Sequence, residues 1–127
     1  MVIKPYAGSD ETALFDLMES EGPEWEDYSV RRRERYKVAL ENSIVYVIYE
    51  DSVLCGYCRC RSDDGFGVYI CDLLVGKRYR GKRFGRLLMT QVCLDFPDEA
   101  VYVMSDVDAY YEKQGYRREG AIFEVRP

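Results

Sequence analysis

Five cations lie close together in one short loop of this chain. Arg78, Arg80, Lys82, Arg83 and Arg86 fall within nine residues. The apolar segment before them is typical of a buried strand, and the segment after them has the period of an amphipathic helix. The first amides of a helix have no partners within it, and the helix macrodipole places partial positive charge there. A strand, a cationic loop containing glycine and a helix N-terminus in this order predict a pyrophosphate site.

The elements that position this loop follow from hydrophobic period and turn residues. Strands are expected at 2–6, 43–49, 53–61, 66–75, 100–104 and 121–125, and helices at 11–20, 29–42, 83–95 and 107–114. Three consecutive strands beside two strand–helix–strand units favour a mixed sheet with helices on its faces. The fold class predicted is α/β (α+β), with a mixed central sheet of about six to seven strands flanked by four helices.

Length and composition narrow the class of protein. The chain has 127 residues, which predicts a single domain over 1–127. No run approaches the roughly twenty apolar residues of a membrane span, and the N-terminus lacks the apolar core of a signal peptide. A formal net charge of −5 argues against nonspecific binding of nucleic acid. We therefore expect a cytoplasmic protein that binds neither a membrane nor nucleic acid.

The chain has five cysteines and no histidine. An odd number of cysteines in apolar segments indicates reduced thiols. The spacing of Cys55, Cys58 and Cys60 invites comparison with a zinc site. On a strand, however, alternation sends Cys55 and Cys58 to opposite faces, and no second pair of ligands is nearby. The sequence therefore predicts structural cysteines and no metal.

Two segments resemble the signatures of one known family, the GCN5-related N-acetyltransferases (GNAT). Residues 75–88 are similar to its acetyl-CoA signature, which Arg80 opens and Gly85 closes. Arg83 stands where the family has its first glycine. An arginine there fits near-helical dihedrals and is strained if the backbone needs positive φ. Residues 108–116 (DAYYEKQGY) are similar to the second signature, a short helix in the expected place.

The resemblance implies a role for each part of the first signature, with acetyl-CoA as the co-substrate. The pyrophosphate is expected to bind the loop and the helix start at Arg80, Gly81, Lys82, Arg83, Phe84, Gly85 and Arg86. The pantetheine arm is expected to pair with the backbone of Leu73, Leu74 and Val75. The Leu73 amide would then polarise the thioester carbonyl.

The catalytic residues are also predicted through the resemblance. Tyr111 corresponds to the tyrosine that protonates the departing thiolate and contacts the cofactor, although a core tyrosine is the alternative. With no histidine present, the base is a carboxylate or a water chain. Asp72, on the strand before the loop, is the best-placed candidate, and a buried structural aspartate is the alternative. Glu24 and Glu26 are further candidates for the base. Alternation puts its side chain on the face opposite Leu73.

The acceptor site is expected between the first two helices, where Glu24, Trp25, Glu26 and Tyr28 combine carboxylates with aromatic faces. Such a set favours a small cationic amine; an ordinary solvated loop is the alternative. The function predicted is direct transfer of acetyl to a primary amine in a ternary complex. A sensor that binds acyl-CoA without turnover and a nucleic-acid-binding domain with a basic face at 31–37 and 77–86 are the other hypotheses. A homodimer is a further expectation, since dimers are common in such folds.

Overall fold

The centre of the molecule is a five-stranded sheet. The computed structural model describes residues 1–127, and the strands lie side by side in the order of the chain. They are β1 (Val2–Pro5), β2 (Ile44–Glu50), β3 (Val53–Ser62), β4 (Val68–Val75) and β5 (Val101–Val103). Neighbouring strands from β1 to β4 are antiparallel, and β5 is parallel to β4. The sheet is therefore mixed, as predicted.

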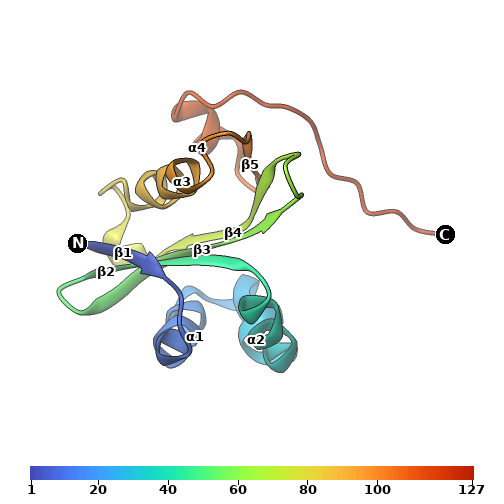
Figure 1. Ribbon diagram of the computed structural model, residues 1–127. Coiled ribbons are helices and arrows are strands. Elements are labelled where there is room, and N and C mark those ends of the chain that lie inside the picture. Colours follow the sequence, from blue (N-terminus) through green and yellow to red (C-terminus); the bar gives the residue numbers. More distant parts are fainter.

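Helices cover both faces of this sheet. They are α1 (Glu11–Glu21), α2 (Arg33–Glu41), α3 (Phe84–Asp95) and α4 (Asp108–Lys113). Helices α1 and α2 lie on one face, α3 lies on the other, and α4 lies beyond α3 (Figure 1). None of the helices combines the length and the apolar content that a bilayer crossing requires. The predicted α/β class is confirmed.

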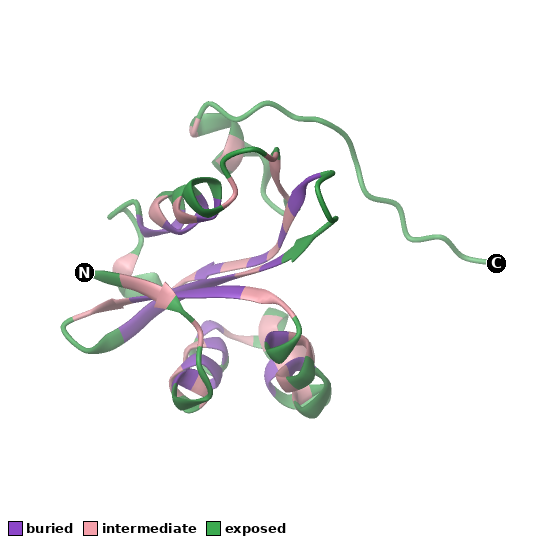
Figure 2. Cartoon of the chain, in the orientation of Figure 1, coloured by how far each residue is buried: buried purple, intermediate pink, exposed green.

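Each face of the sheet buries its own core (Figure 2). The α3 core contains Phe84, Leu88, Met89 and Val92 from α3, packed on Cys58, Cys60, Val68 and Ile70 of the sheet. The α1–α2 core contains Leu14, Phe15, Met18, Tyr36 and Leu40, packed on Val47, Tyr57 and Leu74. Each fully buried Leu or Phe stabilises the fold by roughly 1.5–3 kcal/mol. The sheet is buried on both sides, which explains the long apolar run in β4.

A β-bulge in β4 changes which face each of its side chains joins. Asp72 pairs with Arg59 and Ile70 pairs with Cys60, so that Cys71 is the extra residue. Ile70 and Leu73 both contact the α3 core as a result, although three positions separate them. A bulge bends a strand and re-aims the side chains after it. Here it turns Leu73 toward α3 and Asp72 toward α2, on opposite faces as expected.

A second irregularity corrects the prediction for the cysteines. In the pairing of β2 with β3, Ile48 lies opposite Gly56 and Tyr49 opposite Leu54, which leaves Cys55 unmatched. Cys55 and Cys58 therefore face the same α3 core, and the prediction that they point to opposite faces is wrong. All five cysteines are free thiols. The structure contains no group of three or more metal-ligating side chains that could hold an ion.

The predicted last strand is absent, and the sheet has five strands where six to seven were expected. Residues 121–125 lie in an exposed segment that runs clear of the body, and Phe123 is 84% exposed (Figure 1). A strand requires a neighbour for its N–H and C=O groups, and this segment has none. The helix expected at 29–42 is also divided, into a π-helical turn at Asp27–Arg31 and α2, because Arg32 has an extended φ of −123°.

Candidate active site

The parallel strands β4 and β5 separate and leave one edge of β4 open. β5 pairs with β4 only from Val68 to Ile70, and the last bond runs from the Met104 N–H to the Ile70 carbonyl at 3.0 Å. Beyond that point, residues 71–75 have a neighbour on the β3 side alone. An open edge of this kind can accept another extended chain through backbone hydrogen bonds.

The register determines which amides face the opening. Asp72 pairs with Arg59, Leu74 pairs with Tyr57, and the Gly76 N–H donates to the Cys55 carbonyl at 2.8 Å. Backbone groups in an antiparallel ladder alternate in direction, so the intervening residues point away from β3. The N–H groups of Leu73 and Val75 therefore face the open side. This is the orientation that the predicted role of the Leu73 amide requires.

The loop after β4 leads into α3 through two residues with positive φ. Gly81 has φ 84°, and Arg83 has φ 64° and ψ 22°, in the left-handed region. The near-helical dihedrals that would suit an arginine at position 83 are therefore not adopted. α3 begins at the next residue, and its first internal bond is from the Leu87 N–H to the Arg83 carbonyl at 3.0 Å. The amides of Phe84, Gly85 and Arg86 remain free at the positive end of the helix.

Arg80 holds this loop in place. Its Nε donates to the Val75 carbonyl at 3.0 Å, and its Nη2 lies 2.5 Å from Oε1 of Glu21. The other oxygen of Glu21 accepts the Lys77 N–H at 3.3 Å. Glu21 is only 4% exposed, at the end of α1. One buried carboxylate thus ties α1 to both ends of the loop, a contact that sequence reasoning missed because the partners are 59 positions apart.

The remaining cations of the loop differ in their contacts. Lys82 lies 3.2 Å from a carboxylate oxygen of Glu50. Arg86 uses its Nη1 to bind the carbonyl oxygen of Gln114 at 3.2 Å and its side-chain oxygen at 3.1 Å, at the end of α4. Arg78 and Arg83 form no ion pair, so their charges are available to an anion. Arg86 instead docks α4 onto α3.

Tyr111 lies on α4 and packs against the α3 core. Burial, with smaller contributions from the neighbouring Tyr110, Asp106 and Tyr116, raises the pKa of its hydroxyl to about 12. The phenol is therefore protonated at neutral pH and can act as a hydrogen-bond or proton donor. Its partial burial also agrees with the core role that was the alternative.

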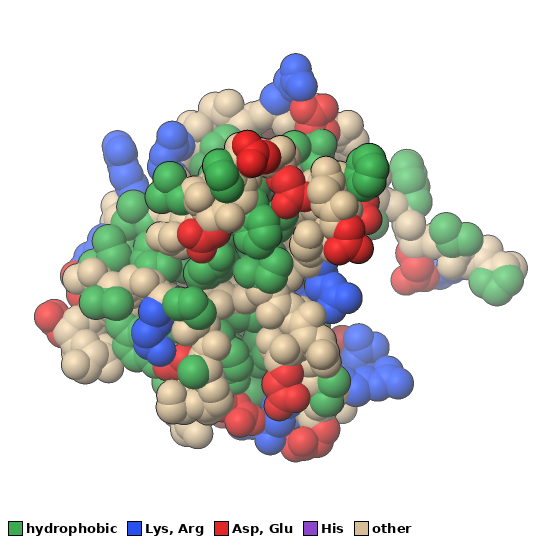
Figure 3. Space-filling model, viewed as in Figure 1, with side chains coloured by type: hydrophobic (Ala, Val, Ile, Leu, Met, Phe, Trp, Pro, Cys, Tyr) green, Lys and Arg blue, Asp and Glu red, His purple; other side chains and the backbone are tan.

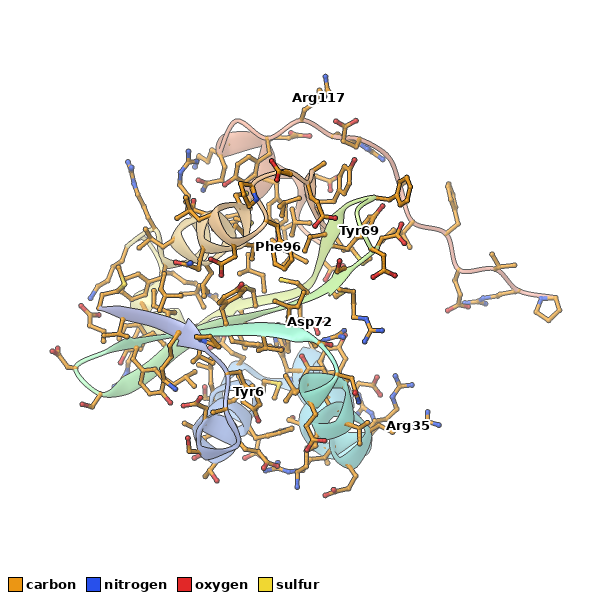
Figure 4. The ribbon with its side chains drawn as sticks, viewed as in Figure 1. Tyr6, Arg35, Tyr69, Asp72, Phe96 and Arg117 are labelled. Atoms are coloured by element: carbon orange, nitrogen blue, oxygen red, sulfur yellow. The ribbon has the colours of Figure 1, made fainter.

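Asp72 belongs to a buried polar network on the α2 side of the sheet (Figure 4). Its Oδ2 accepts hydrogen bonds from Arg59 Nε at 2.6 Å and from the Tyr36 hydroxyl at 2.8 Å. The Tyr36 hydroxyl also lies 2.6 Å from that of Tyr57. Burial lowers the pKa of Arg59, but the hydrogen bond and charge of Asp72 outweigh this and raise it. Asp72 is 7% exposed, and these contacts favour the structural alternative over that of a base.

The predicted acceptor segment forms two short helical turns between α1 and α2, at Pro23–Trp25 and Asp27–Arg31. Its aromatic residues face inward. Trp25 packs edge-on against Tyr57 with ring centres 6.2 Å apart, and Tyr28 stacks on Tyr36 at 4.7 Å. The aromatic faces thus support the α1–α2 core beside the network of Asp72.

The charges of this segment are largely paired. Glu26 lies 3.5 Å from Arg31, Asp27 lies within 3.6 Å of both Arg31 and Arg32, and Glu19 lies 2.9 Å from Arg33. Glu24 is exposed and forms no ion pair. The acidic residues and the basic stretch after them therefore neutralise one another. Charges of both signs are intermixed over the face in Figure 3, which disfavours a basic surface for nucleic acid.

A hollow of the surface lies elsewhere, among β1, β2, α1, α2 and the end of α3. Its lining includes Pro5, Tyr6, Glu11, Lys37 and Asp95. None of its lining residues comes from β4, from the cationic loop or from α4. The open edge of β4 is defined instead by its unpaired backbone groups.

Comparisons with known proteins identify the class that this fold and site define. The model of the acetyltransferase (GNAT) family matches residues 11–116. The chain therefore belongs to the GNAT family, as its two signatures indicated. An uncharacterized N-acetyltransferase of Pyropia yezoensis is 26% identical over 99 residues, which cover 70% of this chain and 57% of that relative. The chain thus spans less than two thirds of the length of this relative.

Solved structures share the fold. A GNAT family acetyltransferase from Streptococcus pneumoniae superposes with a TM-score of 0.74 at 21% identity, covering 99% of this chain and 98% of the other. An aminoglycoside 6'-N-acetyltransferase from Acinetobacter haemolyticus has a TM-score of 0.71 at 14% identity, covering 100% and 99%. Glucosamine-6-phosphate N-acetyltransferase from Arabidopsis thaliana has a TM-score of 0.64 at 20% identity, covering 98% and 97%.

Proposed function

We propose that this chain transfers acetyl from acetyl-CoA to a primary amine, by direct attack of the amine while both substrates are bound. The observation that carries the proposal is the open edge of β4, where the Leu73 and Val75 amides point away from β3 beside the N-terminus of α3. The residues present fit acetyl-CoA in two respects. Unpaired strand amides suit its amide-containing arm, and free helix amides suit its pyrophosphate.

The pyrophosphate binds the amides from Lys82 to Arg86, with Gly81 allowing the backbone to turn. The charges of Arg78 and Arg83 neutralise it. Arg80 contributes by holding the loop in shape rather than by direct contact, because Glu21 and the Val75 carbonyl already occupy its guanidinium. Pantetheine lies along the open edge from Leu73 through Leu74 to Val75.

The chemical step uses one amide and one phenol. The Leu73 N–H donates to the thioester carbonyl and stabilises the negative charge that develops on its oxygen, an interaction worth about 3–4 kcal/mol in comparable sites. The amine nitrogen attacks the carbonyl carbon, the carbon–sulfur bond breaks, and the Tyr111 hydroxyl gives its proton to the departing thiolate. The proton lost by the amine passes to water, and the phenol is restored from solvent.

The acceptor is a small amine that binds at the turns between α1 and α2. Glu24, which has no ion-pair partner, attracts its positive charge, while Trp25, Glu26 and Tyr28 form the wall next to it. Support comes from two structural neighbours, an aminoglycoside 6'-N-acetyltransferase and a glucosamine-6-phosphate N-acetyltransferase. Cytoplasmic location and a homodimer stay predictions.

A panel of amines tests the proposal. Purified protein is incubated with acetyl-CoA and diamines, aminoglycosides, amino sugars or amino acids, and released thiol is followed. Blanks without amine are essential, because Cys93 is exposed and reacts with thiol reagents. We expect turnover of at least one amine, and a kcat for Tyr111→Phe that is lower by roughly 100-fold or more.

Two other outcomes contradict the proposal. Thermal stabilisation by acetyl-CoA without turnover of any amine supports the sensor hypothesis instead. A protein whose melting temperature acetyl-CoA leaves unchanged binds no CoA at this site, and both hypotheses are then wrong.

A further inference from the structure

The hydroxyl of Tyr110 lies where the first turn of α3 meets the open edge of β4. A methyl group built on Gly85 would stand 2.6 Å from the Tyr110 hydroxyl oxygen and 3.8 Å from Cδ2 of Leu73. A gap of 2.6 Å is too short for any carbon–oxygen contact. An alanine at position 85 would therefore force the Tyr110 hydroxyl to move, because that hydroxyl occupies the space that the new side chain would need.

This hydroxyl has no hydrogen-bond partner within the protein. The pKa of Tyr110 is raised, first by burial and then by Tyr116, with no hydrogen bond among the causes. Three tyrosines that pack in or against the two cores have bonded hydroxyls, in contrast: Tyr36, Tyr46 and Tyr49 each donate to an aspartate. Tyr110 is 38% exposed, so that a ligand can reach its side chain.

Tyr110 and Tyr111 do not point the same way. Successive residues of a helix are separated by about 100° around its axis. The two rings are perpendicular, at 88°, with centres 5.0 Å apart. Tyr111 packs into the α3 core, whereas Tyr110 reaches Gly85 at the cationic loop. Two adjacent tyrosines thus present their hydroxyls to different parts of the site.

We infer that Tyr110 is a cofactor-binding residue, whose hydroxyl donates a hydrogen bond to the amide-bearing arm of acetyl-CoA between the loop and Leu73. This inference rests on the proposed function. The arm carries amide carbonyls that need donors, and the open strand edge supplies only the N–H groups of Leu73 and Val75 on this side. A phenol at Gly85 adds a donor from the opposite wall. Tyr110 thereby binds the arm, and Tyr111 donates its proton to the thiolate.

Calorimetric titration separates these roles. The ligands are CoA and adenosine 3′,5′-bisphosphate, which keeps nucleotide phosphates but lacks the arm. Loss of one neutral hydrogen bond weakens binding by roughly threefold to tenfold. We therefore expect Tyr110→Phe to bind CoA more weakly by that factor and the bisphosphate as wild type does. The matched control Tyr6→Phe removes a tyrosine hydroxyl outside the site and should bind both ligands as wild type does.

The results that overturn the inference differ from those that overturn the proposed function. If wild type binds CoA and Tyr110→Phe binds it equally well, the inference is wrong and the proposed function stands. If Tyr110→Phe weakens the binding of CoA and of the bisphosphate equally, the effect lies in the loop, and the contact with the arm is also refuted. If wild type binds no CoA, both are wrong.

A double-mutant cycle tests the geometry without any ligand. Gly85→Ala collides with the hydroxyl in wild type, and its melting temperature should fall. In the Tyr110→Phe background the nearest ring atom is 3.7 Å away, an ordinary contact, so the same alanine should be tolerated. Equal destabilisation in both backgrounds would show that the Tyr110 hydroxyl does not lie against Gly85.

Discussion

Arg83 offers a direct test of how the cationic loop is built. The residue has φ 64° and ψ 22°, a left-handed conformation that costs a side-chain-bearing residue roughly 1–2 kcal/mol. Glycine adopts it without that cost but loses about 0.5–1 kcal/mol of additional chain entropy on folding. Arg83→Gly should therefore stabilise the protein by about 0.5–1 kcal/mol. Removal of a cation from the N-terminal end of α3 adds a few tenths in the same direction.

The matched control is Arg83→Ala, which removes the same charge and keeps the strain. The difference between the two variants isolates the backbone and should be about 1 kcal/mol in favour of glycine, or roughly 3–6 °C in melting temperature. Urea denaturation and calorimetry both measure it. An alanine variant as stable as the glycine variant would refute the reasoning, because position 83 would then not require positive φ.

Three further changes probe the contacts around the site. Glu21→Gln removes the carboxylate that holds Arg80. Because the arginine side chain is 55% exposed, we expect the free energy of unfolding in urea to fall by about 1–3 kcal/mol. Calorimetry should also show weaker CoA binding. Asp72→Asn should lower the free energy of unfolding by about 2–4 kcal/mol, because it leaves the largely buried Arg59 unpaired. The pH profile of kcat should stay unchanged. Loss of its alkaline plateau would identify Asp72 as a base. Burial raises the pKa of Asp10, but hydrogen bonds from Tyr49 and a lysine lower it overall. Its folded pKa is thus below the unfolded value, so its stabilisation is present above about pH 4 and is lost as pH falls, a loss that Asp10→Asn should abolish in acid melting curves.

The features that the sequence predicts well are local. The helix predicted at 83–95 and the turn predicted at the loop glycines depend only on residues a few positions away. The structure has α3 at Phe84–Asp95, next to the loop. The order of strands and helices follows in the same way, up to the end of α4.

The bulge at Cys71 illustrates what the sequence does not reveal. Residues 68–75 are an apolar run in which both faces are buried, so a one-residue shift changes no pattern. The shift nevertheless decides that Leu73 faces α3 and that its amide faces the open edge. Long-range pairing is hidden for a similar reason. Glu21 resembles its acidic neighbours in sequence, and only its position against the loop makes it a structural partner of Arg80.

The segment 121–125 shows the converse error. Its mostly apolar residues predict a strand, but a strand forms only beside a partner, and the pattern carries no information about one. The same limit applies to the acidic and basic stretches between α1 and α2. Each stretch by itself predicts a charged surface. In the structure the two stretches lie close together, and ion pairs between them neutralise most of their charges.

The measurement that tests the account most directly is a map of backbone amide shifts on titration of ¹⁵N-labelled protein with acetyl-CoA. We expect the largest changes at Leu73 and Val75 on the open edge and at the amides of 82–86. Shifts confined to the hollow lined by Tyr6 and Lys37, or no shifts at millimolar acetyl-CoA, would contradict it.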